Sequence, residues 1–143
     1  MNSLIPEFYS LLEQSAAHTG IQLPDTVVHY LALLLADRVR KPIQIPPLGF
    51  GAEYLSIMSD PQFEPIRNFA DRVLFCAGVY PERLTRRGAS ITYFQDLDAT
   101  AYQWCAEISG VEVFDDLARA VPAGAVLISH TVGLGGGELV KFA

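Results

Sequence analysis

Proline and glycine residues divide this sequence into segments whose lengths are typical of helices. Between the breaks, apolar residues recur about every three to four positions, which is the spacing of one face of an α-helix. The first such stretch runs from about Pro6 to Thr19, and Gly20 follows at a position typical of a left-handed helix cap. The second opens at Pro24 and continues to about Lys41. Because this pattern continues along most of the chain, it predicts an all-α fold.

The segment KPIQIPPLGFG, from Lys41 to Gly51, interrupts the helical pattern with three prolines and two glycines. Proline fixes one backbone angle and lacks an amide donor, so this composition excludes a helix interior or a central strand. We expect an ordered loop that crosses a helical bundle. A short helix, AEYLSIM, follows the loop, and a longer one starts near Pro65. On that longer helix, Arg67 and Asp71 are placed to pair on the outer side.

The stretch PERLTRRG carries three arginines, and its ends are marked by Pro81 and Gly88. Proline suits the first turn of a helix and glycine the position after its end, so the pattern predicts a short capped helix, 81–87. We expect this helix to act as a corner. In that role, Arg83 would be anchored to an acidic side chain or to open carbonyl groups of the neighbouring helix.

The pattern after this corner is again helical. Ser90 is a good N-cap for a longer helix that Gly110 ends, and a last amphipathic segment continues to about Val121. Taken together, the segments up to this point predict a single-domain bundle of about six helices with the proline-rich loop packed across it.

The composition changes at Pro122. Residues 121 to 143 carry Glu138 and Lys141 as their only charges, and they include AVLIS, a β-like run that helical periodicity does not predict. We therefore divide the chain into a helical domain, 1–121, and an atypical glycine-rich tail, 122–143. We expect AVLIS to pack in extended form against the bundle or a second copy, so that the protein forms a homo-oligomer through this end.

The whole-chain composition narrows the class of protein. The chain has 143 residues, 50% of them hydrophobic, and a net charge of −6. This apolar content is typical of a globular protein, and the acidic balance argues against a nucleic-acid binder. No secretory signal and no apolar run of about 18 residues is visible, so we expect a cytoplasmic protein that does not cross a membrane. Cys76 and Cys105 are then expected to be reduced, buried thiols.

Patterns typical of catalytic or metal sites are missing from the sequence. No glutamate is followed three positions later by histidine, and His18, His29 and His130 are far apart. The run GLGGGE lacks the spacing and the following helix of a nucleotide-binding loop, and no serine or cysteine lies in a nucleophile motif. We therefore expect no metal, no cofactor and no catalytic residue.

What remains is a polar and aromatic group around the short helix. The candidate ligand- or partner-binding residues in it are Arg83, Arg87, Tyr93, Asp98 and Tyr102. Asp98 and Tyr102 are four positions apart and share a helix face. Two interpretations stay open: the side chains line a site, or the arginines pair with aspartates and tie adjacent helices together while the tyrosines bury their rings.

Two classes of function follow from these observations. The lack of a catalytic pattern favours a non-enzymatic interaction or adaptor module that binds a protein partner, since helical surfaces commonly recognise other proteins. The alternative is a small enzyme or an anionic-ligand-binding protein. Its site would lie between the short helix 81–87 and the helix that begins after Ser90.

The stretch LFCAGVYPERLTRRGASITYFQDLDATAYQ resembles the core of an uncharacterised family of small, all-helical bacterial proteins. The family pattern is LFxxGFFPE(R/S)L, then a tyrosine–aromatic pair, then a small residue followed by tyrosine. The matching residues are Leu74, Phe75, Gly78, Pro81, Glu82, Leu84, Tyr93, Phe94, Ala101 and Tyr102. The likeness covers roughly residues 5 to 120 and implies an all-helical fold. It implies no activity, substrate or catalytic residue.

The end of the chain departs from this resemblance. Members of the family finish in a polar amphipathic helix, whereas this chain continues as PAGAVLISHTVGLGGGELVKFA. Either the tail is an elaboration with its own partner, or the end of the reading frame has been replaced.

Overall fold

The computed structural model describes residues 4–38, 41 and 43–136 of the chain. These residues form eight α-helices and a final π-helical turn, and they contain no β-strand. The elements are α1 (Ile5–Thr19), α2 (Asp25–Arg38), α3 (Gly49–Met58), α4 (Phe63–Val79), α5 (Pro81–Thr85), α6 (Ile91–Ser109), α7 (Glu112–Arg119), α8 (Val121–Thr131) and η1 (Val132–Gly136). The prediction of an all-α fold is confirmed, with eight helices where about six were expected.

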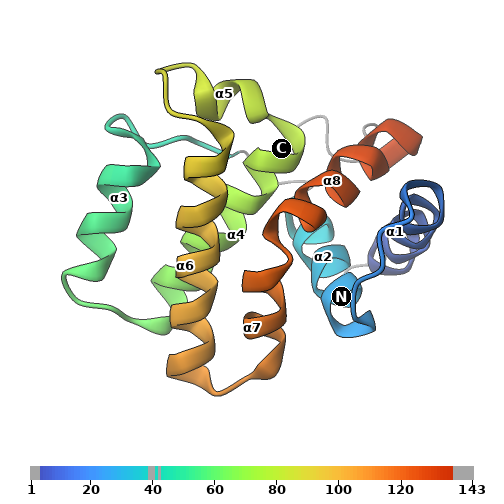
Figure 1. Ribbon diagram of the computed structural model, residues 1–143, viewed down its shortest axis with the longest axis horizontal. Helices are drawn as coiled ribbons and strands as arrows, with labels where there is room; N and C mark the ends of the chain where they lie inside the picture. The colour runs from blue at the N-terminus through green and yellow to red at the C-terminus, as the bar shows by residue number, and fades with distance from the viewer. Residues whose placement is uncertain (1–3, 39–40, 42, 137–143) are drawn as a thin grey trace.

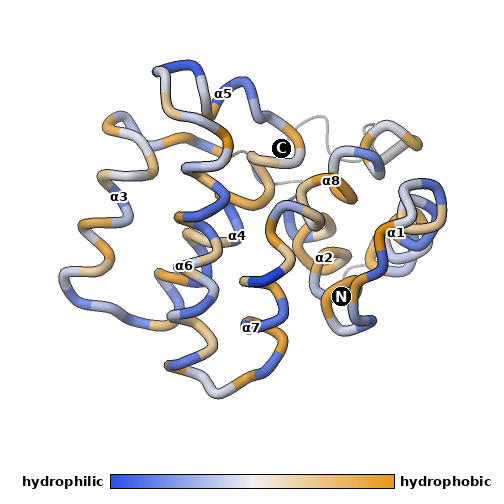
Figure 2. The backbone as a smooth tube through the Cα atoms, viewed as in Figure 1, coloured by the Kyte–Doolittle hydropathy of each residue, from blue (hydrophilic) through white to orange (hydrophobic). Residues whose placement is uncertain are grey.

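Helix α4 lies at the centre of the arrangement (Figure 1). It packs against α6 and α8, while α6 packs against α7, and α1 packs against α2 and α8. The apolar side chains of these helices form one buried cluster, with Phe8, Phe69, Phe75 and Tyr102 among its largest members. Figure 2 shows how hydrophobic and hydrophilic residues alternate along the backbone. Hydrophobic segments lie on α8, and the turn after α5 is hydrophilic.

The helix ends follow the local glycine and serine signals. Gly20 and Gly110 adopt left-handed conformations, with φ of 74° and 70°, and end α1 and α6 as expected. The Ser90 hydroxyl accepts a hydrogen bond from the amide of Tyr93 at 3.1 Å, so it is the N-cap of α6. These predictions are confirmed. They could be made from the sequence because each helix end depends on only a few neighbouring residues.

The run AVLIS, 125–129, lies within α8, so the expectation of an extended conformation is wrong. Ala125, Leu127 and Ile128 are buried, and α8 packs against both α1 and α4. Pro122 lies in the first turn of α8, where the missing amide hydrogen costs nothing. Burial against two neighbouring helices outweighs the intrinsic β-propensity of this run. The glycine-rich run after α8 predicts a loose end for the last five residues of the chain, and these residues lie outside the part that the structure describes.

The proline-rich segment is non-helical from Ile43 to Leu48. Gly49 begins α3 with a positive φ of 85°, and its amide donates to the carbonyl oxygen of Pro46 at 2.8 Å. Ile43 is buried and Ile45 packs against the core. The segment therefore lies on the helices, and α3 begins slightly earlier than the sequence pattern predicts.

The prediction that Arg67 and Asp71 form an ion pair on the outer side of the helix is wrong. Nη2 of Arg67 lies 3.2 Å from Oε2 of Glu64 instead. Asp71 is partly buried, and its Oδ1 accepts hydrogen bonds from the hydroxyls of Tyr30 and Tyr102, each at 2.8 Å. Residue 71 thus faces α2 and α6, and spacing along one helix cannot predict which neighbours that helix will have.

Candidate functional site

The structure places the five candidate residues from the sequence in two separate regions. Arg83, Arg87 and Tyr93 line a surface pocket. Asp98 and Tyr102 are fully buried and do not line it. The pocket is therefore the candidate site, and the other two residues need a separate account.

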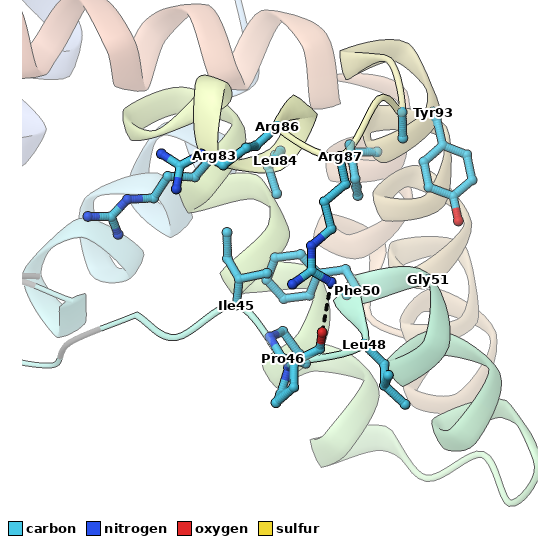
Figure 3. A pocket seen from close by; sticks show the side chains of 14 residues that line it. Ile45, Pro46, Leu48, Phe50, Gly51, Arg83, Leu84, Arg86, Arg87 and Tyr93 are labelled. Atoms are coloured by element: carbon cyan, nitrogen blue, oxygen red, sulfur yellow. Dashed lines mark hydrogen bonds between the residues drawn. The ribbon is translucent and has the colours of Figure 1, made fainter.

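The pocket has a volume of about 420 Å³ and lies between the loop before α3, the turn after α5 and the start of α6 (Figure 3). The residues that line it are Ile45, Pro46, Pro47, Leu48, Gly49, Phe50, Gly51, Arg83, Leu84, Arg86, Arg87, Ala89, Tyr93 and Phe94. Most of these residues are apolar, and every charged residue among them is an arginine. We refer to this pocket as the arginine pocket.

Local sequence explains why the arginines gather here. Pro81 lies in the first turn of α5, and Gly88, with φ of 100°, makes a turn that a residue with a side chain would adopt only with strain. Leu84, which is 4% exposed, points into the core and fixes the short helix against it. Arg86 and Arg87 lie between Leu84 and Gly88 and are exposed.

Arg87 connects the turn to the proline-rich loop. Its Nη1 donates a hydrogen bond to the carbonyl oxygen of Pro47 at 2.7 Å, which is the dashed line in Figure 3. Arg83 has a different contact, because its guanidinium carbon lies 4.2 Å from the centre of the Tyr80 ring. The anchoring role expected of Arg83 therefore belongs to Arg87, and Arg83 is an exposed residue.

The arginines of the pocket differ from most other cations of the protein. Arg72 pairs with Glu53, and Arg119 lies 2.6 Å from a carboxylate oxygen of Asp115. Within the part of the chain that the structure describes, no carboxylate lies within ion-pair distance of any of the three pocket arginines. In a chain with a net charge of −6, the rim of the arginine pocket is a local positive patch.

Apolar side chains surround this positive patch. Phe50 and Phe94 are buried in the lining, whereas Leu48 is 83% exposed on the rim. Tyr93 lies at the edge beside Gly51, where an added Cβ atom would be only 2.5 Å from the tyrosine hydroxyl. A group bound in the pocket would therefore meet an apolar floor, with exposed guanidinium groups along the rim.

Asp98 and Tyr102 belong to a buried polar cluster between α4 and α6. The Tyr102 hydroxyl donates to Asp71, as described above. Both carboxyl oxygens of Asp98 are buried without a hydrogen-bond partner among the described residues. Burial raises the pKa of Asp98 well above its usual value, and the nearby charge of Asp71 acts in the same direction. Burial therefore favours the protonated, neutral form of the Asp98 carboxyl group.

Sequence reasoning selected two of the three pocket arginines but not the apolar part of the pocket. The sequence pattern places Leu48 and Phe50 in a loop, and Leu84 is marked only by the family resemblance. A signal was available, because apolar residues in a loop rich in proline and glycine commonly pack on a neighbouring element.

Within the described residues, no group of three or more histidine, cysteine, aspartate or glutamate side chains is arranged to hold a metal ion. None of the helices in this part of the chain is both long enough and apolar enough to cross a membrane on its own. The segments Glu112–Arg119 and Val121–Leu134 meet these criteria only as a pair, with a bend of 81° between them.

Comparisons with protein-family models, with curated proteins and with solved structures find no match to this chain. The resemblance to the helical bacterial family therefore stays a prediction, and the candidate site rests on the geometry of its own residues.

Proposed function

We propose that the protein is a non-enzymatic interaction module whose arginine pocket binds an acidic segment of a partner protein. The observation that carries this proposal is the occurrence of three exposed arginines, without carboxylate partners among the described residues, around an apolar pocket. The partner segment would place an apolar side chain in the pocket and carboxylates on the rim. Such a combination of aromatic, apolar and arginine contacts is typical of protein interfaces.

The size and chemistry of the pocket support this assignment. A volume of about 420 Å³ accommodates a leucine or phenylalanine side chain with neighbouring backbone. Leu48 on the rim would lose its solvent exposure on binding, which is favourable for an apolar side chain. Arginine suits the rim because its planar guanidinium binds carboxylates with two parallel hydrogen bonds.

The direction of the arginines favours an extended partner over a compact ligand. In Figure 3, Arg83 and Arg86 extend to one side of the pocket, whereas Arg87 points toward the loop. Arg87 is also occupied by its bond to Pro47. Because the positive groups do not converge on one point, several separated carboxylates match them better than one small anion. The alternative is a small anionic metabolite or substrate in the same pocket.

Fluorescence anisotropy of labelled peptides of about ten residues, with one leucine among aspartates and glutamates, tests the proposal. We expect saturable binding that weakens as salt rises, and a loss of about twofold to fivefold in affinity for Arg86→Gln. Arg119→Gln, which removes the same charge from α7, is the matched control and should bind as the unmodified protein does. Binding that Arg86→Gln leaves unchanged would contradict the proposal.

The same titration distinguishes binding of an acidic peptide from binding of a small anion. Octanoate combines one carboxylate with an apolar chain and is a suitable small competitor. If octanoate binds at the pocket and none of the acidic peptides does, the protein binds a small anion, and the interaction module is the wrong assignment.

Self-association through the C-terminal end is a separate proposal. Val126, on α8, is 49% exposed and offers one apolar contact on this end of the chain. Sedimentation equilibrium of the full chain and of a Val126→Glu variant tests it: a dimer that the variant weakens supports the proposal, and a monomer contradicts it. A cytoplasmic location likewise remains a proposal.

A further inference from the structure

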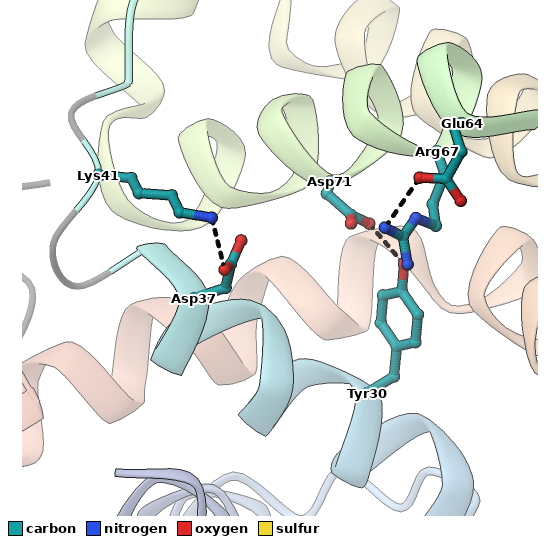
Figure 4. Close-up of polar contacts among 6 residues, drawn as sticks. All are labelled: Tyr30, Asp37, Lys41, Glu64, Arg67 and Asp71. Atoms are coloured by element: carbon teal, nitrogen blue, oxygen red, sulfur yellow. Dashed lines mark hydrogen bonds and ion pairs between the residues drawn. The ribbon is translucent and has the colours of Figure 1, made fainter. Parts of the chain in front are cut away.

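A second cleft, between α2 and α4, is lined mainly by polar groups and has a volume of about 480 Å³. Asp71 on α4 and Tyr30 on α2 face each other in it, with Arg67 alongside (Figure 4). The cleft shares no lining residue with the arginine pocket. A ligand in this cleft would therefore not occupy the arginine pocket.

Two hydroxyl groups fix the carboxyl group of Asp71 at this cleft. Tyr30 and Tyr102 both donate to Oδ1, each at 2.8 Å. The two tyrosine rings meet edge to face, and each also packs against Phe114, so the donors are held in place. Within the described residues, the second oxygen, Oδ2, makes no hydrogen bond. Oδ2 of Asp71 is thus an oriented hydrogen-bond acceptor to which no described group of the protein donates.

Burial raises the pKa of Asp71 above its usual value, and the two tyrosine hydrogen bonds and the positive charges of Arg67 and Arg38 offset this rise only in part. An ammonium group bound at Asp71 would favour the ionised carboxylate. Arg38 and Arg67 line the same cleft as Asp71. A ligand bound to Asp71 would lie within reach of the same two cations.

The cleft also has unsatisfied donors. Arg67 pairs through Nη2 with a glutamate of its own helix, whereas its Nη1, the other terminal nitrogen, makes no hydrogen bond among the described residues. For Arg38, no carboxylate among the described residues lies within ion-pair distance. Lys41 differs, because it pairs with Asp37 at 2.8 Å. The open groups are therefore one acceptor, on Asp71, and two sets of donors, on Arg67 and Arg38.

We propose that this cleft binds a small zwitterion, with an ammonium group on Asp71 and a carboxylate on Arg38 and Arg67. A ligand with one sign of charge would leave the opposite group of the cleft unmatched, and buried polar groups without partners are costly. The α-amino acids are the chemical class that carries both groups within a few bonds. A volume of about 480 Å³ lies in the range of small-molecule sites.

Isothermal titration calorimetry with each of the standard α-amino acids tests this proposal. We expect at least one to bind with a Kd of about 1 mM or tighter. Its analogues without the amino group and without the carboxylate should each bind about tenfold more weakly or worse, because each lacks one charge-assisted contact. If no amino acid binds, or if the analogues bind equally well, the proposal is overturned.

Variants locate the binding in the cleft. Arg38→Gln should weaken the tightest amino acid by about tenfold, whereas Arg119→Gln on α7 should not change its affinity. Asp71→Asn removes the charge but keeps an oxygen for the two tyrosines, and it should also weaken binding. If circular dichroism shows that Asp71→Asn does not fold, the Arg38→Gln result decides. Affinity unchanged in Arg38→Gln, or lost only in Arg86→Gln, overturns the proposal.

Discussion

Gly78 on α4 is the position where the docking of α8 responds most sharply to one added carbon atom. A Cβ atom at residue 78 would lie 2.5 Å from Cγ2 of Ile128 and 3.1 Å from the carbonyl oxygen of Ala125. Helices α4 and α8 would have to move apart to accept it. Gly124, on the α8 side, is the matched control, because a Cβ atom there would meet Leu74 at 3.9 Å, an ordinary contact.

The two substitutions should change stability in opposite directions. Alanine favours a helix interior over glycine by up to about 1 kcal/mol, and the gain is smaller at both positions, because Gly78 lies next to the end of α4 and Gly124 near the start of α8. At residue 78, overpacking costs about 1 to 3 kcal/mol, and the backbone contact places the cost toward the upper end. We therefore expect Gly78→Ala to lower the free energy of unfolding by about 1 to 2 kcal/mol. Gly124→Ala should raise it by about 0.5 kcal/mol, since residue 124 lies near the helix start.

Urea unfolding followed by circular dichroism measures both free energies, provided that the slopes with denaturant agree between variants. The expected order of stability is Gly124→Ala, then the unmodified protein, then Gly78→Ala. A Gly78→Ala variant as stable as Gly124→Ala would refute the packing of α8 on α4, and with it the helical assignment of the AVLIS run.

Two further substitutions test the interior and the pocket. Asp98→Leu should raise the free energy of unfolding by about 1 to 3 kcal/mol at neutral pH, because it removes a buried carboxyl group that has no hydrogen-bond partner among the described residues. The folded chain keeps a proton on Asp98 that the unfolded chain releases, so stability falls as pH rises from the unfolded pKa toward the raised folded pKa. The gain from Asp98→Leu should therefore be larger at about pH 8 than at about pH 5, and an equal gain would contradict a protonated Asp98. Arg87→Ala should lower the free energy of unfolding by about 1 kcal/mol or less, because the exposed hydrogen bond to Pro47 is lost. It should also speed hydrogen exchange at the Gly49 amide. Unchanged exchange at Gly49 would contradict the hydrogen-bonded connection between the turn after α5 and the loop before α3.

The features that the sequence predicts well are those decided within a few residues. Gly20 and Gly110 end their helices because a left-handed residue after a helix favours glycine, and Ser90 begins one because its hydroxyl reaches a free amide. The short helix that starts at Pro81 and the turn at Gly88 are likewise local features, although the anchoring expected of Arg83 is not found. These assignments need no knowledge of the neighbouring helices.

The sequence predicts less well the features that depend on distant segments. The AVLIS run is helical because α1 and α4 bury it, and nothing within those five residues indicates these neighbours. Asp71 is partly buried because Tyr30 and Tyr102 reach it from two other helices. Asp98 is an intermediate case, since it lies on the same helical stripe as the buried Phe94 and so had a signal for burial.

The most direct test of the proposed function is where an acidic, leucine-containing peptide perturbs the NMR amide spectrum of the labelled protein. The account predicts saturable shifts concentrated at Leu48, Leu84 and Arg86, which are weakened in Arg86→Gln and retained in Arg119→Gln. Shifts concentrated around Asp71, or no saturable shifts at all, would contradict the assignment of the arginine pocket as the partner-binding site.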